Sequence, residues 1–128
     1  MRPLHAIALF AALLALAGSV RSDEAELDTD LMHGIEDTNK SLASNIAVKN
    51  SVAASSDAKE LGGMFVQVQA YFERKSDAAD AVALAKKSQE LSAQIVQSVS
   101  ASDFAAATDS ATSLSRTCKT CHAFYKKS

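Results

Sequence analysis

The stretch DFAAATDSATSLSRTCKTCHAFY, residues 103–125, carries the pattern that decides the fold. Its apolar, small and sulfur-bearing residues recur every three or four positions, which is the spacing of one face of an α-helix. Ser102 stands directly before the stretch and is a candidate N-cap for a helix that begins near Asp103. The residues on the expected face are Phe104, Ala107, Ala111, Leu114, Cys118, Cys121, His122 and Tyr125.

A similar pattern begins near Asp23. Apolar residues recur at helical spacing there, namely Leu27, Leu31, Ile35, Leu42 and Ile46. Because successive residues are about 100° apart around a helix, Met32 falls on the edge of this stripe and His33 falls nearly opposite it. We therefore expect a first helix on which His33 points away from the core.

Two more helices are expected in the middle of the chain. Residues 50–56, NSVAASS, are small and polar and indicate a connection. Asp57, with Glu60 three residues later, predicts a capping box at the start of the second helix, and Ser76 or Asp77 can cap the third. The stripes are Leu61, Phe65, Val68 and Phe72 in one helix, and Ala81, Leu84, Ala85, Ser88, Leu91, Ile95 and Val99 in the other.

The composition agrees with an all-α fold. The 128 residues include one proline, four glycines and no tryptophan. Four helices with short connections predict an up-and-down antiparallel four-helix bundle. The formal net charge is −2, and the sequence shows no stripe of basic residues of the kind that a nucleic-acid-binding protein needs. No Ser-His-Asp set, phosphate loop or carboxylate pair is visible, so we do not expect an enzyme.

The first 22 residues predict a secretory signal peptide. Arg2 supplies a positive start, and residues 6–17, AIALFAALLALA, are continuously apolar but too short to span a bilayer. Small residues allow cleavage after Ala17 or after Ser22. We expect a protein exported to the periplasm, with residues 23–128 as its one folded domain and no membrane span after cleavage.

The last helix holds both cysteines of the chain, in the sequence Cys118-Lys119-Thr120-Cys121-His122. The pattern C-x-x-C-H is typical of covalent haem c attachment. Residues i, i+3 and i+4 share one face of a helix, so both thiols can meet one edge of a haem while the imidazole reaches its iron.

Three other interpretations of the cysteine pair remain open. A structural zinc site needs four ligands, and the domain offers only His33 as a further histidine. A dithiol redox motif usually opens a helix after a strand, whereas this motif closes a helix. A disulfide between positions i and i+3 would restrict the unfolded chain very little.

The chain resembles the cytochrome c-prime family. The resemblance rests on a signal peptide, four helices, and a C-x-x-C-H motif in the last turns of the final helix, followed by Tyr125 and a basic residue, Lys126, four positions after the histidine. It implies a monohaem electron carrier in which Cys118 and Cys121 hold the haem and His122 is the proximal iron ligand. It also implies an unidentified redox partner protein and a possible homodimer through the first two helices.

The resemblance implies that the first helix supplies the distal side of the haem. Low-spin members place a methionine there and transfer electrons, so Met32 is the expected distal ligand. His33 and Met64 are weaker candidates. High-spin members place an apolar side chain there and bind nitric oxide or carbon monoxide, which would put Leu31 or Ile35 beside an open iron.

Further expectations concern the side chains that would surround the haem. An apolar wall is expected from Leu31, Ile35, Phe65, Val68 and Tyr125. Arg74 and Arg116 could pair with the haem propionates, because a guanidinium binds carboxylates well. Three lysines, Lys119, Lys126 and Lys127, could steer an acidic partner or could simply favour a helix C-terminus.

Overall fold

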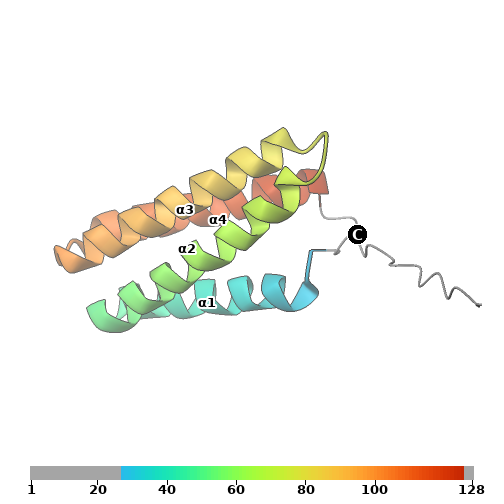
Figure 1. Cartoon of the computed structure of the whole chain (residues 1–128). Helices are drawn as coiled ribbons and strands as arrows, with labels where there is room; N and C mark the ends of the chain where they lie inside the picture. Colours follow the sequence, from blue (N-terminus) through green and yellow to red (C-terminus); the bar gives the residue numbers. More distant parts are fainter. Residues whose placement is uncertain (1–26, 126–128) are drawn as a thin grey trace, which may run out of the picture.

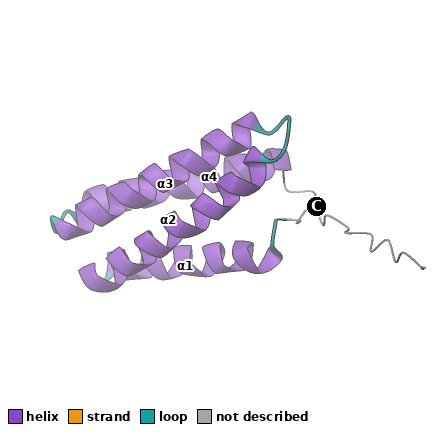
Figure 2. Ribbon diagram, in the orientation of Figure 1, coloured by secondary structure: helices purple, strands orange, loops and turns teal. Residues whose placement is uncertain are grey.

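The computed structural model describes residues 27–125, so the predicted signal peptide, its cleavage sites at Ala17 and Ser22, and Lys126 and Lys127 lie outside the described residues. Short turns join four antiparallel helices into a bundle (Figure 1). They are α1 (Thr29–Ala47), α2 (Ser51–Glu73), α3 (Ala79–Ser100) and α4 (Phe104–Tyr125). Figure 2 shows helix along nearly all of the described chain. The predicted all-α, up-and-down bundle is therefore confirmed.

The start of α2 differs from the prediction. Residues 50–56 do not form a connection, because all but the first of them belong to α2. Asn50 is the N-cap, and its side-chain oxygen accepts a hydrogen bond from the backbone N–H of Ala53 at 3.1 Å. Lys49 has a φ of 57°, which completes the turn from α1. A side-chain cap of this kind satisfies a backbone donor that the helix itself leaves unpaired, so α2 starts early.

The predicted capping box at Asp57 is therefore also wrong. Asp57 lies inside α2, and its carboxylate oxygen Oδ2 accepts hydrogen bonds from Ser41 Oγ and Asn45 Nδ2 of α1, each at 2.8 Å. The acid that suggested a helix start instead joins two helices. A charged acceptor makes such bonds stronger than those between neutral groups.

Two other caps also differ from the prediction. The N-cap of α3 is Ala78, not Ser76 or Asp77, and it makes no side-chain cap bond. Ala78 is buried, so packing decides this helix start. At α4 the cap comes from Asp103, whose carboxylate accepts from the N–H of Ala106 at 3.0 Å. Ser102 has a φ of 56° and forms the preceding turn.

The bundle has two different ends. We call the end that contains the α1–α2 and α3–α4 turns the closed end, because two of the three interhelical turns lie there. Leu42, Ile95 and Val99 are buried towards this end, and Leu61 and Leu114 are fully buried in the middle of the bundle. The opposite end carries the start of α1, the end of α2, the start of α3 and the end of α4, and we call it the open end.

The helices are not equally attached to one another. The contact between α2 and α3 is the most extensive, and α1 packs mainly on α2 and touches α4 at few points. Figure 1 shows α1 and α2 close together at their turn and diverging away from it. Between residues 27 and 125, no helix is both long and apolar enough to cross a membrane.

Candidate functional site

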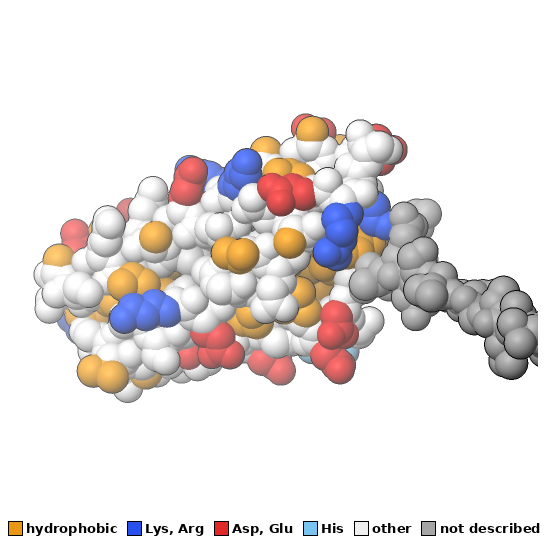
Figure 3. Space-filling model, viewed as in Figure 1, with side chains coloured by type: hydrophobic (Ala, Val, Ile, Leu, Met, Phe, Trp, Pro, Cys, Tyr) orange, Lys and Arg blue, Asp and Glu red, His pale blue; other side chains and the backbone are white. Residues whose placement is uncertain are grey.

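A cleft of about 1010 Å³ lies at the open end, and all four helices contribute side chains to its walls. Its volume is at the upper limit of ordinary ligand sites. Figure 3 shows hydrophobic side chains between acidic and basic groups near this end of the molecule. The cleft is therefore large enough for an organic cofactor and mainly apolar inside.

The α4 wall of the cleft carries Cys118, Cys121 and His122 together. Both thiols are half-buried and pack against the core, whereas His122 is exposed at the rim. Both cysteines are free thiols. The spacing of three and four residues places all three side chains along the same side of α4, as the sequence predicted.

The surroundings of the two thiols make them poor nucleophiles. Burial, and then the neighbouring Cys121, raise the pKa of the Cys118 thiol above its ordinary value. Burial also raises the pKa of the Cys121 thiol. Reactive redox cysteines have lowered pKa values, because the thiolate is the attacking species. The site therefore lacks the electrostatics of a dithiol oxidoreductase.

The α1 wall carries Met32. Its side chain is half-buried, packs against the hydrophobic core and lines the cleft. Met64 is not among the lining residues. Its sulfur lies at the crossing of α1 and α2, only 3.4 Å from where a Cβ at Gly34 would stand. Met64 therefore fills an interhelical contact, and Met32 is the methionine placed at the cleft.

The position of His33 was only partly predicted. The side chain is exposed, as its place opposite the apolar stripe indicated, but it also lines the cleft. The cause lies in the tertiary structure. Because α1 touches α4 at few points, the cleft between them reaches the side of α1 that carries His33. Helical periodicity alone cannot report the distance to a neighbouring helix.

The residues expected around the haem can be compared with the residues that line the cleft. Four of the five expected members of the apolar wall line the cleft, namely Ile35, Phe65, Val68 and Tyr125. Leu31 does not line it and packs against the core instead. Phe72 adds a ring whose centroid lies 5.0 Å from that of Tyr125. This contact joins the last turns of α2 and α4 at the open end.

The cationic side chain at the cleft was missed. Arg74 and Arg116 are exposed and do not line it, and Lys119 is exposed on α4. Lys75 lines the cleft instead, with its Nζ 5.1 Å from the centroid of the Tyr71 ring. The spacing of four residues between Tyr71 and Lys75 was the available signal, since such residues are neighbours on a helix.

The donor set fits a haem better than a bare metal ion. Within residues 27–125, no group of three or more His, Cys, Asp or Glu side chains could hold a metal ion. The cleft instead offers two thiols and an imidazole on α4, a thioether on α1, and apolar side chains between them. A haem c needs thiols for attachment, axial donors, and a largely apolar pocket.

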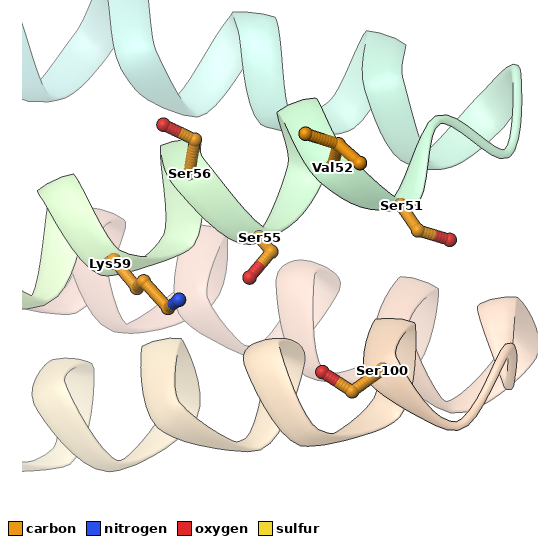
Figure 4. A pocket seen from close by; sticks show the side chains of 6 residues that line it. All are labelled: Ser51, Val52, Ser55, Ser56, Lys59 and Ser100. Atoms are coloured by element: carbon orange, nitrogen blue, oxygen red, sulfur yellow. The ribbon is translucent and has the colours of Figure 1, made fainter.

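A second hollow lies at the closed end, between the start of α2 and the end of α3. It is open, with a volume of about 500 Å³, and its lining residues are Ser51, Val52, Ser55, Ser56, Lys59 and Ser100 (Figure 4). These residues include neither a thiol nor an imidazole. The two cysteines, His122 and Met32 line the cleft at the open end and not this hollow.

Comparison with known proteins identifies no relative. No protein-family model, no curated protein and no solved structure matches the chain. The residues of the cleft are therefore the observations from which a function can be inferred.

Proposed function

We propose that this protein is an exported electron carrier with one covalently bound haem c. Cys118 and Cys121 hold the haem through thioethers, His122 is the proximal iron ligand and Met32 is the distal ligand. The observation that supports this best is that all four side chains line one cleft. When bound, an iron with His and Met ligands supplies one-electron redox chemistry at a raised potential.

The remaining side chains suit this role. Phe65, Val68 and Phe72 are buried and would exclude water from the bound group. On α3, Ala85 and Ser88 face the cleft with small side chains, which leave room for a flat cofactor. A dry, apolar site limits the reorganisation of charge that accompanies a change of oxidation state. The electron passes to a partner protein outside the cytoplasm, and the proposed export rests on the pattern of residues 1–22.

The test is the mass and absorption spectrum of the mature chain. We expect one added haem mass and a c-type spectrum when the chain is exported in cells that supply the attachment machinery. The double variant Cys118→Ala, Cys121→Ala is the matched control and should carry no covalent haem. A wild-type mass equal to that of the bare polypeptide would contradict the proposal.

A gas-binding haem protein is the second candidate. Ile35 is buried and lines the cleft one turn after Met32, so an apolar side chain is available beside an iron that Met32 does not bind. This candidate predicts a high-spin resting spectrum and rapid binding of carbon monoxide. The electron carrier predicts a low-spin resting spectrum and slow binding of carbon monoxide in the wild-type chain, because the Met32 sulfur occupies the position that the gas needs.

A thiol oxidoreductase is not favoured. The raised pKa values of Cys118 and Cys121 keep both groups protonated near neutral pH. Such an enzyme would show two thiols that react with iodoacetamide in the mature protein. Two blocked thiols together with one added haem mass would eliminate it.

A further inference from the structure

Two side chains that can bind haem iron stand next to each other on α1 and line the same cleft. Met32 is half-buried and packs against the core, and His33 is exposed. Thioether sulfur and imidazole nitrogen are both common axial ligands of haem iron. The open end therefore offers two donors on the α1 wall for one coordination position.

His33 belongs to a polar row on α1. Thr29, His33 and Glu36 follow one another at spacings of four and three, and all of them line the cleft. This row runs beside the apolar row of Met32 and Ile35. Both rows reach the cleft because α1 touches α4 at few points. An exchange of one row for the other needs a local rearrangement of the first turns of α1, because successive helical residues are about 100° apart.

The attachment of α1 to α2 leaves room for such a change. The hydrogen bonds from Ser41 and Asn45 to Asp57 lie in the half of α1 near the closed end. Nearer the cleft, Gly34 lies beside Met64, whose sulfur is 3.4 Å from where a Cβ at Gly34 would stand. A glycine backbone against a flexible methionine does not interlock the two helices in the way that ridges of side chains do.

We propose that His33 is a second distal iron ligand that replaces Met32 when the Met32 sulfur leaves the iron. The inference rests on the proposed function. Successive helical residues are about 100° apart, so the two side chains cannot both face one iron. One neutral donor replaces another, and neither a proton nor an electron is transferred. Because imidazole does not raise the potential as a thioether does, the two states differ in potential.

The experiment uses the full haem-loaded protein and three variants, namely Met32→Ala, His33→Ala and the double variant. Optical, EPR and near-infrared magnetic circular dichroism spectra of the oxidised forms report the ligands directly. We expect Met32→Ala to stay six-coordinate and low-spin with a bis-histidine signature, and the double variant to become fully high-spin. His33→Ala should keep the histidine–methionine spectrum. Added imidazole should restore the low-spin state of the double variant, which checks that its cleft is intact.

The outcomes separate this inference from the proposed function. A wild-type chain without covalent haem would overturn both. A haem-loaded chain whose Met32→Ala variant is high-spin would overturn the role of His33 alone. A Met32→Ala variant that is low-spin, with a spectrum unchanged by the additional loss of His33, would also overturn it.

Discussion

The closed and open ends of the bundle are built from the same helical spacing and differ in how closely α1 approaches its neighbours, since α1 and α2 diverge away from their turn (Figure 1). Towards the closed end Leu42 and Ile95 are buried together with the smaller Ala54 and Ala107. At the open end Ala85 and Ser88 of α3 stand at the equivalent inward positions and leave the cleft. Protein interiors are normally close-packed, so a hollow with well-ordered walls indicates a volume kept for another molecule.

The largest effect should come from a leucine at one of two inward positions near the middle of α3, Ser92 on the side of the closed end or Ser88 on the side of the cleft. Ser92 and Ser88 are one turn apart, both are buried, and each hydroxyl donates to the carbonyl four residues earlier, at 2.8 and 2.9 Å. Ser92 faces Gly62, where a Cβ would lie 3.7 Å from the Ser92 Cβ. We expect Ser92→Leu to overpack the closed end and to lower the free energy of unfolding by about 1–3 kcal/mol.

The matched variant Ser88→Leu should behave differently, because Ser88 lines the cleft. In the haem-free chain its cost should be clearly smaller than that of Ser92→Leu, as the new side chain enters empty volume. In the exported chain it should reduce the fraction that carries haem. Urea unfolding and mass spectrometry measure the two effects. Equal destabilisation at both positions would show that the ends do not differ in packing.

A smaller effect is expected at two glycines, Gly63 of α2 and Gly34 of α1. Nothing lies within 4 Å of a Cβ added at Gly63, which is exposed in the middle of the helix. Gly63→Ala should therefore raise the free energy of unfolding by about 0.5–1 kcal/mol, because alanine restricts the unfolded chain and suits a helix. Gly34→Ala is the comparison, since its Cβ would press on the Met64 sulfur at 3.4 Å. A thermal unfolding experiment in which Gly34→Ala gains more than Gly63→Ala would contradict this account.

The smallest effect concerns the two thiols and pH. The pKa values of Cys118 and Cys121 are raised in the folded haem-free chain, so the protonated thiols favour folding. This contribution is complete below the ordinary thiol pKa of 9.0 and is lost as the pH rises through the higher folded values. Stability should therefore fall more steeply above that pH in the wild-type chain than in the variant Cys118→Ala, Cys121→Ala. Parallel stability curves for the two chains would show that the open end does not desolvate the thiols.

Much of the site was predictable because it depends on a single helix. The spacing of Cys118, Cys121 and His122 places them along one side of α4 wherever α4 lies. The edge position of Met32 follows in the same way from α1. These are local geometric relations, and they need no knowledge of neighbouring helices.

Features that depend on two helices were mispredicted or missed. Asp57 suggested a helix start because the sequence could not show that Ser41 and Asn45 lie opposite it. His33 pointed away from the stripe of α1, and only the loose approach of α1 to α4 brings it to the cleft. Lys75 was overlooked because its place depends on where α2 ends relative to the other helices.

By itself the sequence determined the four helices, their inward faces and the grouping of both thiols with one imidazole, because the repeat of an α-helix is the same in every context. The tertiary structure alone decided which inward positions are filled and which remain hollow. That outcome depends on the distances between helix axes and on the summed volume of side chains from all four helices. It is the reason why Met32, His33 and the cysteine pair share one cleft.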